Sequence, residues 1–209
     1  MDSMDFVRKN RVFAVIRADS SENALRLAEA CIEGGLKLIE ITFSFPSAEK
    51  TIEKLGKMDD ILVGAGTVLN IEMARSASRS GAGFIISPHT DREIISHAKS
   101  ENLLVASGAL TSNEILKAWN LGADLVKIFP VKSVGGASYI RAIKGLLPFI
   151  EVMTTGGVTI ENFMEFLQAG ATAVGLSTSL IGSGGLADSK TVSQRARKVV
   201  QILSELYVV

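Results

Sequence analysis

Short β-rich runs alternate with amphipathic helical stretches along the entire chain, and this alternation restricts the fold more than any other feature. The runs recur about every 20 to 30 residues without a Pro/Ser-rich linker between halves. Eight strand–helix units in 209 residues match a (β/α)₈ barrel, whereas a doubly wound sheet usually has fewer strands. We therefore predict an α/β fold, a TIM barrel that forms a single domain over residues 1–209. The runs span residues 12–16, 37–43, 61–66, 83–87, 103–107, 124–129, 150–155 and 172–177.

Capping residues mark the expected ends of the helices. Ser20, Asp91 and Thr111 precede helical stretches, where a side-chain oxygen accepts a hydrogen bond from a free backbone N–H. Thr111 and Glu114 together match a capping box. Glycines stand where C-terminal caps are expected, at positions 34, 81, 122 and 170.

Composition limits the location of the protein and its partners. The chain is 47% hydrophobic and carries 22 basic and 22 acidic side chains, which is typical of one soluble globular domain. Zero net charge argues against nucleic acid or an anionic membrane as a partner. The acidic N-terminus lacks a signal sequence, and no apolar run is long enough to span a bilayer. We expect a cytoplasmic protein that acts on small molecules.

The alternation of side chains along two strands predicts which of them face the barrel interior. In KLIEITF (37–43), the more apolar alternate set should meet the helices, which leaves Glu40 and Thr42 inside. In DLVKIF (124–129), the same argument points Lys127 inward. In this fold, catalytic groups lie at the C-terminal ends of the strands, so Glu40 and Lys127 are expected to share one interior site.

A lysine enclosed in a barrel is removed from water, which disfavours ammonium and leaves more free amine to attack a carbonyl. Glu40 would act in the opposite direction, so this interpretation requires desolvation, or a second cation such as Arg17, to dominate. The alternative is an interior ion pair between Lys127 and Glu40 that performs no chemistry. The residues of these two strands alone do not distinguish a nucleophilic lysine from a structural ion pair.

The last two strands end in loops that favour phosphate binding. In TTGGV, the strand ends at Thr155, and Gly156 and Gly157 follow before a helix begins. In AVGLS, the strand ends at Gly175, and Ser177 opens a short helical turn. These are the loops where this fold commonly binds phosphate through backbone N–H groups. Ordinary tight turns are the alternative, and a phosphorylated ligand is the working hypothesis.

Six segments together resemble the 2-keto-3-deoxy-6-phosphogluconate (KDPG) / 4-hydroxy-2-oxoglutarate (KHG) aldolase family. They are VFAVIRA, LIEITFSFPSA, VGAGTVLN, FIISPH, LVKIFPVKSVGG and TTGGV, in this order, and the likeness extends from about Phe6 to Gly182. The resemblance implies a class I aldolase with a barrel fold that acts in the Entner–Doudoroff pathway of carbohydrate metabolism. It also implies a homotrimer and a reaction that needs no cofactor.

The resemblance assigns roles to matching residues. Lys127 would form a Schiff base with the pyruvate ketone, and Glu40 would move protons. Arg17 and Thr67 resemble the groups that hold the pyruvate carboxylate. The phosphate cradle would comprise Gly156, Gly157 and Ser177. Pro88, which shapes the loop after the fourth strand, Thr155 and Gly175 complete the predicted substrate site. We expect no metal, because the iminium polarises the substrate and the only histidines are His89 and His97.

Two positions depart from the family pattern. Ser44 stands where many members have an arginine, which changes how a carboxylate is anchored unless Arg17 replaces that cation. Ser107 stands where the family usually has a proline before Gly108, on the aldehyde side of the pocket. Both departures bear on substrate choice rather than on the lysine chemistry.

The predicted reaction is cleavage of KDPG to pyruvate and glyceraldehyde 3-phosphate, with KHG, which yields pyruvate and glyoxylate, as a further substrate. One alternative is a 2-keto-3-deoxy-6-phosphogalactonate (KDPGal) aldolase. Others are a sugar-phosphate isomerase or epimerase on the same barrel, with Glu40 as base, and a non-catalytic binder of sugar phosphates. Trapping of pyruvate on Lys127 by borohydride separates the aldolases from the rest.

Overall fold

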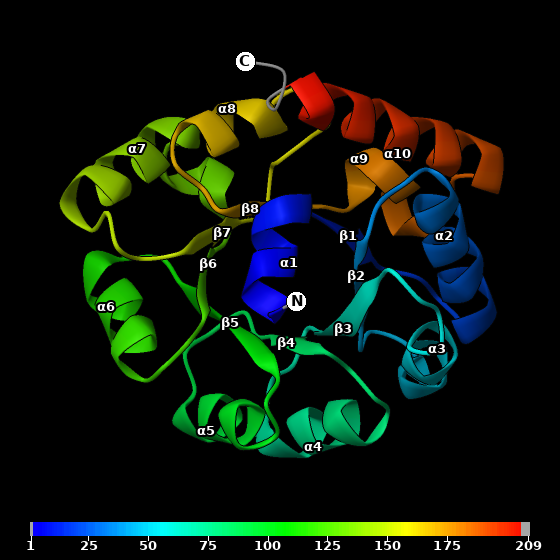
Figure 1. The fold of residues 1–209 in the computed structure, drawn as a ribbon, viewed down its shortest axis with the longest axis horizontal. Helices are drawn as coiled ribbons and strands as arrows, with labels where there is room; N and C mark the ends of the chain where they lie inside the picture. The colour runs from blue at the N-terminus through cyan, green and yellow to red at the C-terminus, as the bar shows by residue number, and fades with distance from the viewer. Residues whose placement is uncertain (1, 206–209) are drawn as a thin grey trace.

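A computed structural model describes residues 2–205, and its eight strands form one closed parallel barrel in chain order, with β8 paired to β1 (Figure 1). The predicted fold class is confirmed, and every strand overlaps a predicted run. The boundaries 1–209 of a single domain stay a prediction. The strands are β1 (Val12–Ile16), β2 (Leu38–Thr42), β3 (Leu62–Gly66), β4 (Phe84–Ile86), β5 (Leu104–Ala109), β6 (Leu125–Ile128), β7 (Val152–Thr154) and β8 (Ala173–Leu176).

The helices surround the barrel, except that α1 lies over its centre in Figure 1. Thr111 and Glu114 form the predicted capping box, and Ser20 and Asp91 are N-caps as expected. The helices are α1 (Ser3–Asn10), α2 (Ser21–Glu33), α3 (Ala48–Leu55), α4 (Ile71–Arg79), α5 (Arg92–Ser100), α6 (Ser112–Asn120), α7 (Ala137–Leu146), α8 (Phe163–Gln168), α9 (Thr178–Ile181) and α10 (Ser189–Ser204), with 3₁₀ turns η1 (Val131–Val134) and η2 (Ser183–Gly185).

Period-2 alternation divides the strand residues between two apolar cores. Ile39, Ile41 and Val126 pack in the outer core between the barrel and the helices, as predicted. Leu38 and Leu125 pack in the inner core that fills the lower part of the barrel. Since residues two positions apart on a strand point to the same face, Glu40 and Lys127, which follow Leu38 and Leu125 at that spacing, also point inside the barrel.

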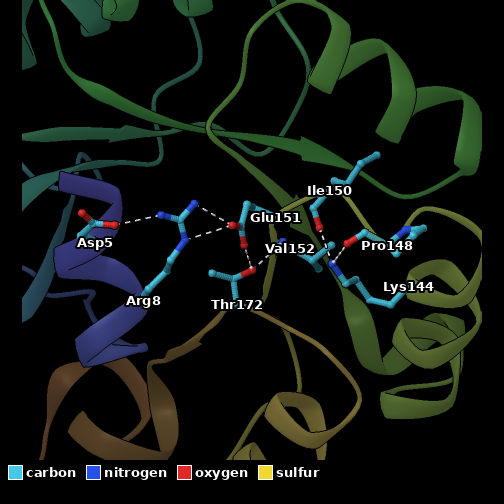
Figure 2. Close-up of polar contacts among 8 residues, drawn as sticks. All are labelled: Asp5, Arg8, Lys144, Pro148, Ile150, Glu151, Val152 and Thr172. Atoms are coloured by element: carbon cyan, nitrogen blue, oxygen red, sulfur yellow. Dashed lines mark hydrogen bonds and ion pairs between the residues drawn. The ribbon is translucent and has the colours of Figure 1, made fainter. Parts of the chain in front are cut away.

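Helix α1 closes the N-terminal end of the barrel, an arrangement that the sequence did not reveal. Its Met4 and Val7 side chains join the inner core. Figure 2 shows that Arg8 of this helix contacts Glu151, just before β7, through two hydrogen bonds of 3.1 and 2.8 Å, and that Thr172 donates to the same carboxylate. These contacts fasten the helix to the starts of β7 and β8, the strands whose opposite ends lead into the TTGGV and AVGLS loops.

The Glu151 carboxylate is ionised more readily than an ordinary glutamate. Burial raises its pKa, but hydrogen bonds from Thr172 and Arg8, together with the charges of Arg8 and Lys144, outweigh burial and lower the pKa. A group with a lowered folded-state pKa stabilises the fold above its unfolded pKa, and this contribution is lost as the pH falls through the folded value. The anchor of α1 is therefore intact at neutral pH.

Candidate active site

Glu40 on β2 and Lys127 on β6 face the same cavity at the C-terminal end of the barrel. The cavity has a volume of about 730 Å³ and is lined by both side chains. Glu40 is 1% exposed and Lys127 is 6% exposed. The prediction that these two residues share the barrel interior is thus confirmed by their positions.

The two buried charged groups lie near each other without pairing. Among the described residues, no ion pair or hydrogen bond joins Glu40 to Lys127, although the Lys127 charge acts on the Glu40 carboxyl. The Lys127 Nζ atom lies 5.6 Å from the centre of the Phe129 ring. This geometry does not support the alternative of a structural ion pair, because such a pair needs direct contact to offset desolvation.

The environment of the Glu40 carboxyl changes how readily it ionises. Burial raises the pKa of its carboxyl, while the positive charges of Lys127 and Arg17 oppose that rise. Its Oε2 atom is buried and has no hydrogen-bond partner. A buried carboxyl with a raised pKa and a free oxygen that faces a cavity has the properties of a general base or acid.

Gly66 at the end of β3 creates the space that the Glu40 side chain occupies. A Cβ atom on Gly66 would lie 2.0 Å from Glu40 Oε1 and 2.7 Å from Cδ. Real Cβ contacts are never this short, so any larger residue here would displace the carboxylate. The position of the Glu40 carboxylate therefore requires a glycine at position 66, in the GAGT segment.

The loops after β7 and β8 form the other end of the cavity. Gly156 and Gly157 have φ values of 82° and 97°, which glycine adopts without strain. In the described part of the chain, neither of their N–H groups donates a hydrogen bond to protein. Thr155 Oγ1 and Ser179 Oγ are buried without partners. Free donors and hydroxyls that converge on one end of a cavity can bind an oxyanion.

Every residue of the predicted site lines this one cavity. Of the outer residues, Arg17 is exposed, and Thr67 and Pro88 are half-buried. Their roles in binding stay predictions. The ten residues are Lys127, Glu40, Arg17, Thr67, Pro88, Thr155, Gly156, Gly157, Gly175 and Ser177.

Sequence reasoning missed several residues of the same cavity. Phe129, directly after β6, is 45% exposed and lines the cavity beside Lys127. Ser179 lies two residues after Ser177 on the short helix α9, and that spacing was the only signal for it. Ser183 and Gly184 come from the following 3₁₀ turn, which no motif marked.

The two departures from the family pattern both lie beside the cavity and make local hydrogen bonds. Ser44 Oγ lies 2.7 Å from Thr42 Oγ1, which donates to the Ile16 carbonyl next to Arg17. Ser107 Oγ donates to the His89 carbonyl at 3.3 Å, in the loop that carries Pro88. Neither serine lines the cavity itself.

The described residues contain no cluster of three or more His, Cys, Asp or Glu side chains able to bind a metal ion. Among residues 2–205, no helix is long and apolar enough to cross a membrane.

Three comparisons relate the chain to known proteins. A sequence profile described as KDPG and KHG aldolase matches residues 4–196. The chain is 34% identical over 184 residues to the 2-dehydro-3-deoxy-6-phosphogalactonate aldolase of Escherichia coli, covering 87% of this chain and 89% of the relative. It is 29% identical over 200 residues to the 2-dehydro-3-deoxy-phosphogluconate aldolase of Treponema pallidum, covering 92% and 95%.

A solved structure shares both the fold and a related sequence. It is the KDPG aldolase of Legionella pneumophila, with pyruvate captured as a covalent carbinolamine intermediate. The two structures superpose with a TM-score of 0.85 at 28% identity, over 94% of this chain and 97% of the other.

Proposed function

The chain belongs to the KDPG and KHG aldolase family and is an aldehyde-lyase, and from this premise we propose that it cleaves KDPG to pyruvate and glyceraldehyde 3-phosphate through a Schiff base on Lys127. The observation that carries the proposal is that Lys127 and Glu40 are buried in one cavity without forming an ion pair. The covalent capture of pyruvate in the Legionella relative supports it.

The reaction would begin with attack of the Lys127 amine on the C2 ketone, which gives a carbinolamine. Loss of water, with Glu40 moving the protons, leaves an iminium. Glu40 then takes the proton of the C4 hydroxyl, the C3–C4 bond breaks, and its electron pair moves into the iminium. This releases the aldehyde and leaves an enamine, which is protonated at C3. Water finally hydrolyses the iminium to free pyruvate and Lys127.

The two ends of the cavity would hold the two ends of the substrate. Arg17 and Thr67 would bind the carboxylate, beside Pro88. Thr155, Gly156, Gly157, Gly175 and Ser177 would form the phosphate end, and Ser179 adds a hydroxyl there. Fixing both ends orients the C3–C4 bond for cleavage. We propose that no cofactor takes part, because the iminium serves as the electron sink.

Pyruvate release from three keto acids tests this proposal. KDPG is expected to give the highest kcat/KM, with KHG at least about tenfold lower, because KHG lacks the phosphate that the free N–H groups would bind. Pyruvate is measured by coupling to lactate dehydrogenase. Release of no pyruvate, with interconversion of sugar phosphates instead, would favour the isomerase or epimerase.

Cleavage of KDPGal is the second candidate activity. It is favoured by the likeness to the E. coli galactonate enzyme and by Ser44, which leaves Arg17 as the cation at the carboxylate end. The two aldolases share the lysine chemistry and differ in the configuration at C4. A kcat/KM for KDPGal above that for KDPG would assign this activity instead.

A methyl group on Gly66 is expected to lower kcat/KM about 100-fold. Gly66→Ala must push the Glu40 carboxylate aside, and a displacement of about 1 Å can cost that much. Overpacking should destabilise the fold by only about 1–3 kcal/mol. Gly145→Ala on helix α7 is the matched control, because its added methyl meets no atom within 4 Å. Full activity in Gly66→Ala would contradict this account of Glu40.

We also propose that the enzyme is a cytoplasmic homotrimer whose single domain spans residues 1–209. Light scattering after size-exclusion chromatography tests the trimer, since a monomer would elute with a mass near 22.2 kDa.

A further inference from the structure

A second cavity of about 530 Å³ lies beside the active site, separated from it by the loop after β7. The two cavities share Gly157 and Thr159 as wall residues. Lys132 and Arg141 line the second cavity, and both are exposed. Within residues 2–205, neither cation forms an ion pair or a side-chain hydrogen bond. The Glu165 carboxylate also lines this cavity, so its charged side chains sum to about +1.

Lys132 is attached to this loop through both its backbone and its side chain. Its N–H donates to the Gly156 carbonyl at 3.0 Å. A Cβ atom on Gly157 would lie 2.4 Å from Lys132 Cβ and 2.9 Å from Cδ, so the lysine stem covers Gly157. The ammonium is thereby tethered next to the peptide units of Gly156 and Gly157, whose N–H groups donate no hydrogen bond to the described residues. The stem packs on the loop and the charged end stays in water.

The net positive charge inside the active-site cavity is smaller than the negative charge of a phosphorylated keto acid. The charged residues that line it are Arg17, Glu40 and Lys127, which sum to about +1 when all three are ionised. A phosphorylated keto acid brings one carboxylate and a phosphate of about −1.5 to −2 charge. The remaining negative charge needs a cation close to the phosphate end, and Lys132 is attached to that loop.

We propose that Lys132 pairs electrostatically with the substrate phosphate across Gly157 and so makes the enzyme selective for phosphorylated keto acids. The formal charges of Arg141 and Glu165, which line the same second cavity, offset each other, so the inference is confined to Lys132. The inference rests on the proposed function, because it takes the loop after β7 as the phosphate site. Lys132 would act on binding and not on the chemistry at Lys127.

Steady-state kinetics of Lys132→Met and Lys132→Arg test the proposal. Methionine preserves the stem that covers Gly157 and removes the charge. The KM of Lys132→Met for KDPG is expected to rise about five- to tenfold, which is the effect of one solvent-screened charge pair. Its kcat should stay within about twofold of the parent value. Arginine should restore KM, and added salt should reduce the difference between parent and Met variant. KM for KHG, which has no phosphate, should respond by less than about twofold.

Lys190→Met, which removes an exposed lysine at the start of α10, is the control for a general loss of positive charge. An equal rise in KM for KDPG and KHG, or an equal effect of Lys190→Met, would overturn the proposal. Thermal unfolding of each variant shows whether the fold is intact.

Calorimetric binding of glycerol 3-phosphate separates this inference from the proposed function. If the parent protein releases no pyruvate but binds glycerol 3-phosphate, and Lys132→Met weakens that binding, the proposed cleavage fails and the role of Lys132 stands. Binding that is equal in the parent and the Met variant overturns the role of Lys132, even if KDPG is cleaved.

Discussion

Replacement of Lys127 by arginine is expected to abolish pyruvate release, with kcat lower by about 10⁴-fold or more. Arginine preserves the positive charge and the length of the side chain, but its guanidinium stays protonated and cannot attack a ketone. If Lys127 served only to hold a substrate electrostatically, as in an isomerase, arginine would preserve much of the activity. The substitution therefore distinguishes a role of Lys127 as a nucleophile from a role as a positive charge only.

Reduction with borohydride in the presence of pyruvate measures the same property directly. The parent protein is expected to lose activity and to gain the mass of reduced pyruvate on the peptide that contains Lys127, whereas Lys127→Arg gains none. Lys132 lies five residues further on and provides an internal control, because its side chain lines the neighbouring cavity. Labelling of Lys132, or substantial turnover in Lys127→Arg, would contradict a Schiff base at position 127.

The barrel and the centre of its site could be predicted because both follow from local patterns. Side chains alternate between the two faces of a strand. The apolar alternation in residues 37–43 and in residues 124–129 was therefore enough to predict that Glu40 and Lys127 point inward. Parallel strands of a barrel all end at one rim, so the position of a residue in its strand also predicts which other residues it meets. No knowledge of distances was required for this step.

Features that depend on distance or on docking could not be predicted in this way. The absence of an ion pair between Glu40 and Lys127 depends on the width of the barrel, which no local pattern encodes. Helix α1 is short and mostly polar, and Met4 and Val7 alone do not indicate that it closes the barrel. The α2 helix ends at Glu33, its C-cap Gly34 keeps a helical conformation, and the positive φ of 98° is at Gly35, which the sequence pattern did not single out.

Glu40→Gln is expected to lower kcat by about 10²- to 10⁴-fold, because a carboxamide has nearly the same shape and cannot accept the C4 hydroxyl proton. Glu40→Asp is the companion variant: it preserves the charge but withdraws the carboxylate by one methylene, and should also lose most of its activity. A parent-like rate in the glutamine variant would remove Glu40 from the mechanism. In that case a water or another group would have to move the proton.

The pH dependence of activity supplies an independent measurement. Burial raises the pKa of Glu40, against the opposing charges of Lys127 and Arg17, so a base at this position loses its proton at a higher pH than an ordinary carboxyl. The acidic limb of the profile of kcat against pH should therefore lie above the ordinary range for glutamate. This limb should disappear in the residual activity of Glu40→Gln. Retention of the limb would assign it to another group.

The stability of Glu40→Gln should change in the direction opposite to its activity. Because the folded-state pKa of Glu40 is raised, the native state takes up a proton more readily than the unfolded chain, and this contribution is lost as the pH rises through the raised value. Above the raised pKa, the ionised carboxylate, whose Oε2 atom has no partner, therefore opposes folding, and in that pH range glutamine should increase the free energy of unfolding measured in urea. The gain should shrink towards acid pH, where the parent carboxyl is protonated. A glutamine variant that is less stable than the parent over the pH range in which Glu40 is ionised would show that attraction to Lys127 and Arg17 outweighs burial, and that the Glu40 carboxylate stabilises the barrel.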